Sequence, residues 1–286
     1  MKIILSRKGF DSSFGGCASP IFPDGSLVTL PIPEDFVGVP SPTRPITYAE
    51  LLGSPNIGVL VTDLTRQLKK PIDASDLVHL DPDLRPEALS RDAGWRPIFG
   101  QSHAAGTHLK NQHIGEGDIF LFFGWFREVE ERDGRWNFKR GVPDLHVIFG
   151  WLEVGEVRNL ENDLGQVPEW ARSHPHVTPD YGPNNTLYVA ATINGHYSAG
   201  NFPTVSEALT LTREGSSRSS WRLPKGFHPV EGKSSLSYHS NPKRWRLDGD
   251  FTNLTSVGRG QEFVLDTADY PEAEGWARKL IADNSQ

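Results

Sequence analysis

The chain has 286 residues, of which 37% are hydrophobic and 23% are charged, the balance of a folded globular protein. Its longest apolar run is far shorter than the roughly 20 residues that cross a bilayer, and its N-terminal apolar stretch is too short for a secretion signal. The single cysteine, Cys17, excludes an internal disulfide framework. We therefore expect a cytoplasmic protein with no membrane contact.

The charge is unevenly distributed along the chain. The formal net charge is −7, whereas residues 213–259 hold nine Lys or Arg and four Asp or Glu, a net of +5. Such an acidic body argues against coating of nucleic acid, but a local basic segment permits a confined phosphate contact. Aromatic residues alternate with the cations, as in surfaces that neutralise phosphates and stack on bases. Lys243 and Arg244 are the candidate phosphate ligands of this basic segment. The alternative interpretation is that the segment is a solvated face whose aromatic residues belong to the core.

Residues 1–7 predict a first strand, and a loop rich in glycine and serine follows it. Consecutive backbone amides in such a loop can form a nest that binds an anion. The loop matches neither common glycine-rich nucleotide motif, so a plain surface turn is an equal alternative. If the loop holds a phosphate, Asp11 should orient it without touching the anion. The candidate contacts are Arg7, Lys8, Ser12, Ser13, Gly15 and Gly16.

The next segments predict a short helix at 46–52, with Thr47 and Glu50 as a capping box, and a buried strand at 57–63.

The run HLDPDLR, residues 79–85, places two carboxylates two residues apart beside His79. On a strand Asp81 and Asp83 would share one face and could hold a metal, whereas on a proline-bent loop they would cap turns. We favour the loop and expect no resident metal. Asp81 and Asp83, together with His103, are nevertheless the candidate catalytic residues.

The stretch from 103 to 157 organises the rest of the chain. It predicts a helix at 103–111, an apolar strand at 118–126, a hairpin at Asp133-Gly134 and a second strand at 146–157. Each strand carries a Gly-Trp pair, and glycine within a strand marks a bulge, a bend or a ligand close to the backbone. The candidate base-pocket residues are Gln101, His103, Trp125 and Trp151.

Three histidines in this stretch invite a metal hypothesis that their spacing weakens. His103, His108 and His113 are five residues apart, which on a continuous helix separates neighbours by about 140°. They cannot all face one ion from such a helix.

The remaining elements are predicted with less detail. They are a long polar loop at 162–185 that holds His174-Pro175-His176, a strand at 186–193, a hairpin at Asn194-Gly195, a short strand at 208–212 and a closing helix at 271–283.

The central stretch resembles the core of PUA-like barrels, the superfamily of PUA, ASCH, EVE and YTH domains. The resemblance rests on the small residues Ala104 and Ala105, on Gly117-Asp118, on the aromatic end of the first strand and on the pattern of residues 148–154. It covers about a fifth of the chain. It implies a pocket at one end of a barrel that holds RNA or a modified base.

The first half of the chain resembles the nucleotide-modification-associated domain family, third type. The matching motifs are SRKGFDSSFGG at 6–16, SPIFPDG at 19–25, PIPE at 31–34, HLDPDLR at 79–85 and GDIFLFFGWFR at 117–127. This family is associated with the handling of modified DNA bases, and the resemblance implies a context without a settled reaction.

Together these observations predict an α+β fold, with a mixed sheet that curls into a PUA-like β-barrel with flanking helices and long loops. We expect one elaborated domain over 1–286, with the barrel core at about 100–200 and the basic, aromatic-rich segment at 213–259. The predicted function is recognition of a nucleotide or nucleobase, in particular a modified base in nucleic acid. An enzyme acting on such a base, as a transferase or metal-dependent hydrolase, and a structural subunit with protein partners in a modification or defence complex are the alternatives. The sequence leaves catalysis and the cofactor open.

Overall fold

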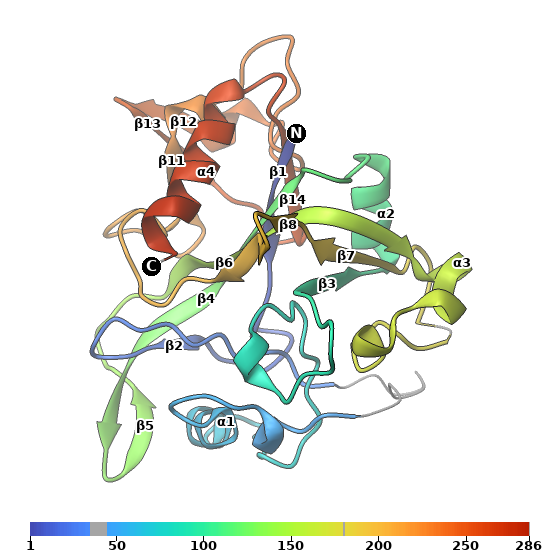
Figure 1. The fold of residues 1–286 in the computed structure, drawn as a ribbon. Coiled ribbons are helices and arrows are strands. Elements are labelled where there is room, and N and C mark those ends of the chain that lie inside the picture. The colour runs from blue at the N-terminus through green and yellow to red at the C-terminus, as the bar shows by residue number, and fades with distance from the viewer. Residues whose placement is uncertain (35–44, 180, 286) are drawn as a thin grey trace.

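The computed structural model describes residues 1–34, 45–179 and 181–285, which form an α+β fold around a large curved sheet (Figure 1). In this part of the chain, nine strands belong to the sheet, and its main path runs β14-β1-β4-β6-β7-β3. The strands of this path are β14 (Glu262–Asp266), β1 (Lys2–Arg7), β4 (Ile119–Arg132), β6 (Leu145–Asn159), β7 (Thr186–Ala190) and β3 (Ile98–Gln101). The short strands β2 (Ser19–Ile21), β5 (Arg135–Phe138) and β10 (Ala199–Asn201) pair with β4 or β6 beside the path. Within the described residues, no helix is both long and apolar enough to cross a membrane.

The two apolar strands of the central stretch are adjacent, as predicted. β4 pairs antiparallel with β6 from Ile119↔Glu153 to Phe126↔Leu145, and β1 pairs with β4 in parallel on its other side. Phe120 and Phe122 lie on one face of the strand and Phe123 on the other, yet all three are fully buried. The absence of polar alternation in β4 therefore reflects cover on both faces.

The glycines of the Gly-Trp pairs are required by neighbouring backbone. A Cβ on Gly124 would lie 2.7 Å from the Lys8 carbonyl oxygen, and one on Gly150 would lie 2.8 Å from the Gly200 carbonyl oxygen. A register shift between β4 and β6 lies beside Gly150, which agrees with the expected bulge.

The expected closed barrel is not found. In the described part of the chain no backbone pairing joins β3 to β14, so these two strands remain the ends of the sheet path. The sheet nevertheless curls, because Gln101 at the end of β3 donates a hydrogen bond of 2.7 Å to Glu262 at the start of β14. The two ends therefore meet through side chains, and a cavity lies beside this contact.

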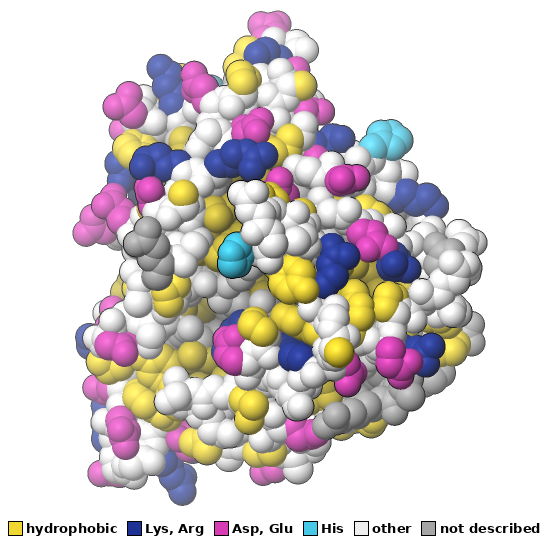
Figure 2. Space-filling model, viewed as in Figure 1, with side chains coloured by type: hydrophobic (Ala, Val, Ile, Leu, Met, Phe, Trp, Pro, Cys, Tyr) yellow, Lys and Arg dark blue, Asp and Glu magenta, His cyan; other side chains and the backbone are white. Residues whose placement is uncertain are grey.

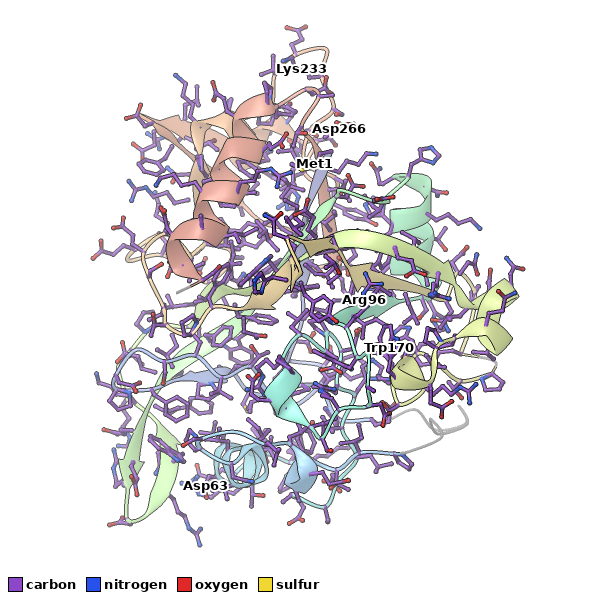
Figure 3. The ribbon with its side chains drawn as sticks, viewed as in Figure 1. Met1, Asp63, Arg96, Trp170, Lys233 and Asp266 are labelled. Carbon is purple, nitrogen blue, oxygen red and sulfur yellow. The ribbon has the colours of Figure 1, made fainter. Side chains whose placement is uncertain are left out.

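The predicted strand at 57–63 is wrong, because this segment is the helix α1 (Ile57–Thr65). Asn56 caps the helix by accepting a hydrogen bond from the Val59 amide, and the buried residues Ile57, Leu60, Val61 and Leu64 recur at helical spacing. A short apolar run alone does not separate a buried strand from a buried helix. Asp63 of α1, labelled in Figure 3, accepts a hydrogen bond of 2.9 Å from the Trp136 amide of β5.

Most other predicted elements are confirmed. The helix α2 (His103–Asn111) has the predicted bounds, and Asp133-Gly134 and Asn194-Gly195 form turns in which both residues have positive φ. The capping box of Thr47 and Glu50 is present at the 3₁₀ helix η1 (Tyr48–Glu50). Residues 208–212 form no strand in the structure, only isolated bridges at Thr210 and Thr212.

The C-terminal part adds a second sheet and a long helix. The strands β11 (Ser220–Pro224), β13 (Phe251–Thr255) and β12 (Trp245–Asp248) form a three-stranded antiparallel sheet, and β8 (Thr192–Ile193) pairs with β9 (His196–Tyr197). The helix α4 (Pro271–Asn284) packs against β1 and against the 3₁₀ helix that follows β11, and its buried residues are Ala273, Ala277 and Leu280. The remaining helices are α3 (Leu160–Asp163) and the 3₁₀ helices η2 (Pro86–Ala88), η3 (Leu164–Gln166), η4 (Glu169–Ala171), η5 (Lys225–Phe227) and η6 (Pro242–Arg244).

One substitution in α4 should stabilise the protein. A Cβ on Gly275 would meet nothing within 4 Å, and the residue is exposed within the helix. Gly275→Ala should raise the free energy of unfolding by about 0.5–1 kcal/mol, because alanine loses less conformational entropy on folding into a helix. Urea unfolding measures the difference, and a decrease would mean that this part of α4 is not an exposed helix.

Candidate functional site

A cavity of about 420 Å³ opens where the ends of β3 and β14 approach each other. Its walls come from segments that lie far apart in the sequence. They are the end of β1 with the loop that follows, the β3–α2 junction, residues 260–262 and the side chains of His79, Asp81, His176, Tyr181 and Tyr238. A cavity assembled in this way exists only in the folded chain.

Two histidines and one aspartate converge on one wall of this cavity. His79, Asp81 and His176 each offer one ligand atom, and these atoms all lie within 4.8 Å of one another. The three side chains are buried, with between 3% and 9% of their surface exposed. Two imidazoles and one carboxylate are a ligand set that holds Zn²⁺ or Fe²⁺ in proteins and leaves coordination positions open.

The two oxygens of Asp81 have different surroundings. Oδ1 accepts a hydrogen bond of 2.8 Å from the Gly100 amide, and Nε2 of His174 lies 3.2 Å from the same oxygen, although its N–H does not point straight at it. Oδ2 instead faces Nε2 of His176 at 3.8 Å. Burial opposes ionisation of Asp81, but the contact with His174 and the charge of Lys8 lower its pKa below the ordinary value. Asp81 is therefore an anion with one oxygen directed at His176.

His176 presents a lone pair to that oxygen. Its Nδ1 lies 2.8 Å from Oδ1 of Asn185, whose amide nitrogen donates to the His176 carbonyl. Because an amide oxygen only accepts, Nδ1 carries the ring proton and Nε2 is unprotonated. Burial lowers the pKa of His176 well below its ordinary value and keeps the ring neutral. Two acceptors thus face each other without a proton between them, an arrangement that a cation would stabilise.

The outer contacts of the two histidines follow the pattern of metal ligands. A ligating imidazole usually gives its other nitrogen to a carboxylate, a carbonyl oxygen or water, which fixes the tautomer and the ring orientation. Asn185 has this position beside His176, and Oε2 of Glu34 lies 3.0 Å from Nδ1 of His79. The ring of Tyr181 lies against His176, with centroids 4.1 Å apart, and covers it on the cavity side.

Gly100 makes room for this cluster. A Cβ at this position would lie 2.5 Å from the ring of His176 and 2.9 Å from the ring of His174. The same residue donates its amide to Asp81, so this point of β3 supports both ligands. Only glycine allows the two rings to approach the strand so closely.

A second polar cluster lies on the cavity wall. Oε1 of Glu262 accepts hydrogen bonds from Lys8 Nζ at 3.0 Å and from Gln101 Nε2 at 2.7 Å. Glu262 is only 1% exposed, and its other oxygen, Oε2, is buried and has no hydrogen-bond partner among the described residues. A buried carboxylate oxygen without a donor costs free energy, so this atom is suited to accept an N–H group of a ligand. Exposed aromatic rings of Phe14 and Tyr238 lie at the rim.

The structure brings together five of the residues predicted from the sequence. Arg7, Lys8, Asp81, Gln101 and His103 all line the cavity. His103 is exposed at the first turn of α2, where its Nδ1 lies 2.8 Å from the Ser102 hydroxyl oxygen.

Asp83 of the candidate catalytic residues and Trp151 of the candidate base pocket do not line this cavity. Asp83 points away from Asp81 and forms a bidentate ion pair with Arg91 at 2.6 and 2.7 Å, because the chain bends at Pro82 and the two carboxylates do not share a face. Trp151 is buried against Phe202, with ring centroids 4.9 Å apart, and does not line the cavity.

The other predicted phosphate-binding residues, and Trp125 of the predicted base pocket, lie in different places. Ser12, Ser13 and Trp125 line a second hollow beside the cavity. Gly15 and Gly16 line neither, and the Gly16 amide donates to the Asp11 carbonyl oxygen at 2.9 Å, so it is not available to an anion. Asp11 does orient the loop, since its carboxylate accepts from the amides of Ser13 and Phe14. Lys243 and Arg244 are partly or fully exposed on η6 and line neither hollow.

The sequence indicated a possible metal site at Asp81 and Asp83 beside His79, but it gave no such role to His176. The other metal hypothesis concerned His103, His108 and His113, and no resident metal was expected. The available signal was a pair of short patterns, His-x-Asp at 79–81 and His-x-His at 174–176, which place ligand types two residues apart. Neither pattern specifies a site alone, because almost a hundred residues separate them and only folding brings them together.

A family model described as nucleotide modification associated domain 3 matches residues 2–266. The chain belongs to this family. All the residues that line the cavity fall within the matched span, whereas α4 lies beyond it. The description of the nucleotide modification associated domain 3 family associates the chain with nucleotide modification. No curated protein and no solved structure matches the chain.

Proposed function

We propose that this protein is a divalent-metal-dependent enzyme that acts on a nucleotide or nucleobase within a nucleotide-modification system. The observation that carries the proposal is the convergence of His79, Asp81 and His176, whose ligand atoms lie within 4.8 Å of one another on the cavity wall. The family supplies the substrate class, and the ligand set supplies the chemistry.

The ligand set supports activation of water. Three protein ligands leave at least one position of a tetrahedral Zn²⁺ site open, and bound water there has a pKa of about 7. A metal held by His79, Asp81 and His176 would therefore supply activated water for attack on an electrophilic carbon or phosphorus of the substrate. Hydrolysis of a bond in a nucleotide or base is therefore the reaction that we propose. The same ligand set holds Fe²⁺ in oxygenases, so an oxidative reaction is an outcome that the experiment must distinguish.

The second polar cluster supports recognition of a base. Oε2 of Glu262 can accept a hydrogen bond from a ring N–H or an exocyclic amino group, while Lys8 and Gln101 hold the carboxylate in place. Nucleobases present such donors at their edges. The predicted recognition of a nucleobase and the proposed reaction thus belong to the same cavity.

A metal titration of the intact protein tests the proposal. Metal-stripped protein should bind one Zn²⁺, Mn²⁺ or Fe²⁺ per chain, and a free ion concentration of 100 times Kd should stabilise it by about 2.7 kcal/mol. Elemental analysis gives the stoichiometry, and thermal melting gives the stabilisation.

The loaded protein is then incubated with nucleotides that carry modified and unmodified bases, and the products are identified by mass spectrometry. If the Fe²⁺-loaded protein consumes oxygen during turnover, the reaction is an oxidation and not a hydrolysis. If no ion binds stoichiometrically, the proposed metal site is excluded, and nucleobase binding is the function that remains.

A further inference from the structure

A second hollow of about 820 Å³ adjoins the cavity with the metal ligands. Arg7 and Asp11 line both, so the two spaces are separated by the width of a few side chains. The second hollow is also lined by Ser12, Ser13, Trp125, His146 and Arg218. Its lining is thus rich in hydrogen-bond donors.

Two arginines line this hollow without a carboxylate partner in the described part of the chain. Arg7 donates to the carbonyl oxygens of Val257 and Gly258 at 3.3 and 3.0 Å, and its buried Nε has no partner there. The Arg218 guanidinium lies 4.1 Å from the ring centroid of Trp125. Burial lowers the pKa of both arginines and the charge of Arg218 lowers that of Arg7, whereas the charge of Asp11 raises the pKa of both. Two half-buried cations that repel each other favour an anion between them.

The nearest carboxylates are already engaged by other groups. Asp11 accepts hydrogen bonds from the amides of Ser13 and Phe14, at 2.6 and 2.8 Å. Asp144 accepts from Trp125 Nε1 at 3.0 Å and lies 3.7 Å from Arg127. They reduce the positive potential of the hollow but do not pair with its arginines.

His146 adds a neutral donor to the wall. It is 7% exposed, and its Nδ1 accepts a hydrogen bond of 2.9 Å from the indole of Trp221. The ring proton is therefore on Nε2. Burial and the two arginines lower the pKa of His146 well below its ordinary value, so the ring stays neutral. The hydroxyls of Ser12 and Ser13 are exposed at the edge of the same hollow.

We propose that the second hollow binds a backbone phosphate of a nucleic-acid strand whose neighbouring nucleotide occupies the metal cavity, so that the substrate is a polynucleotide and not a free nucleotide. Guanidinium groups bind phosphate oxygens through paired hydrogen bonds, and the stacked Trp125–Arg218 pair gives a flat surface beside them. This inference rests on the proposed function, because the strand is positioned by the nucleotide in the cavity.

The overall charge agrees with such a confined contact. Lys and Arg are interspersed with Asp and Glu over the face in Figure 2, and the chain as a whole has a formal charge of −7. Phosphate binding by a broad basic surface is not expected of this protein, whereas a local arginine pair can bind one or two phosphates.

The test measures the affinity of the metal-loaded protein for a short single-stranded oligodeoxynucleotide, by fluorescence anisotropy over a salt series. Arg218→Gln should weaken binding about tenfold and reduce the salt slope by about 0.7, the value for one lost phosphate contact on a single strand. Lys243→Gln, a cation of the same basic segment that lines neither hollow, is the matched control and should change neither quantity by as much.

The outcomes separate this inference from the proposed function. Metal stoichiometry should be unchanged in Arg218→Gln, because Arg218 does not line the cavity with the metal ligands. Oligonucleotide affinity equal to wild type in Arg218→Gln, or an equal loss in Lys243→Gln, would overturn the phosphate site while the metal site stands. Wild-type protein that binds metal but prefers a mononucleotide to the oligonucleotide would overturn it too. An RNA oligonucleotide of the same sequence shows which sugar the strand carries.

Discussion

His176→Ala should abolish stoichiometric metal binding and all metal-dependent turnover. The side chain is one of the three ligands proposed among the described residues, and its loss leaves the Asp81 carboxylate facing a space without the second nitrogen. Asp81→Asn should have an equally large effect with almost no change of shape, because it removes the negative charge that attracts the ion. Calorimetric titration with Zn²⁺ and elemental analysis measure both losses.

Two further variants define the specificity of this result. His196→Ala removes an exposed histidine on β9, far in sequence from the cluster, and should bind metal like the wild type. Asn185→Ala removes only the partner of His176 Nδ1 and should weaken metal binding by about 10–100-fold without abolishing it. Circular dichroism checks that each variant is folded. Full metal binding by folded Asp81→Asn and His176→Ala would show that the ion, if present, binds elsewhere.

Gly100→Ala should also remove the metal site, although it changes no ligand. The new Cβ would lie 2.5 Å from the His176 ring and 2.9 Å from the His174 ring, so both must move away from Asp81. Such overpacking costs about 1–3 kcal/mol of stability, and the displaced ring no longer directs its lone pair at the ion. Metal affinity should therefore fall at least as far as in Asn185→Ala, with a lower melting temperature.

Gly115→Ala is the matched control for this substitution. A Cβ at Gly115 would meet nothing within 4 Å, so metal affinity and melting temperature should stay close to the wild-type values. Wild-type metal affinity in Gly100→Ala would mean that His176 can retreat from β3 and still bind the ion, or that it is not a ligand.

The elements that the sequence determined by itself are those whose signal is local. Asp133-Gly134 predicts its turn because both residues tolerate positive φ, and both have it in the structure. The apolar run of β4 predicts a strand covered on both faces, because no polar residue marks a solvent side. The family resemblance of the N-terminal motifs is confirmed over residues 2–266 for the same reason, since such motifs are read along the chain.

Local signals failed where two structures satisfy the same pattern. The run at 57–63 suits a buried strand as well as a buried helix. The helix is stabilised by the cap at Asn56 and by the hydrogen bond between Asp63 and β5. The sequence predicted a sheet that curls into a barrel. The sheet does curl, but among the described residues its end strands do not pair. Side chains of Gln101 and Glu262 join the ends of the path where backbone pairing does not, which leaves the cavity between them.

In the candidate site, local sequence patterns predicted some of the residues, and only the tertiary structure brought the others together. Sequence alone identified Asp81 and Lys8 as chemically interesting, because a carboxylate beside a histidine and a cation after a strand are visible in a short window. Only the tertiary structure separated Asp81 from Asp83, since the bend at Pro82 directs one carboxylate to His176 and the other to Arg91. Only the tertiary structure joined His79 to His176, because a ligand set needs atoms a few ångströms apart, and distance in space between remote segments is not encoded in any local pattern.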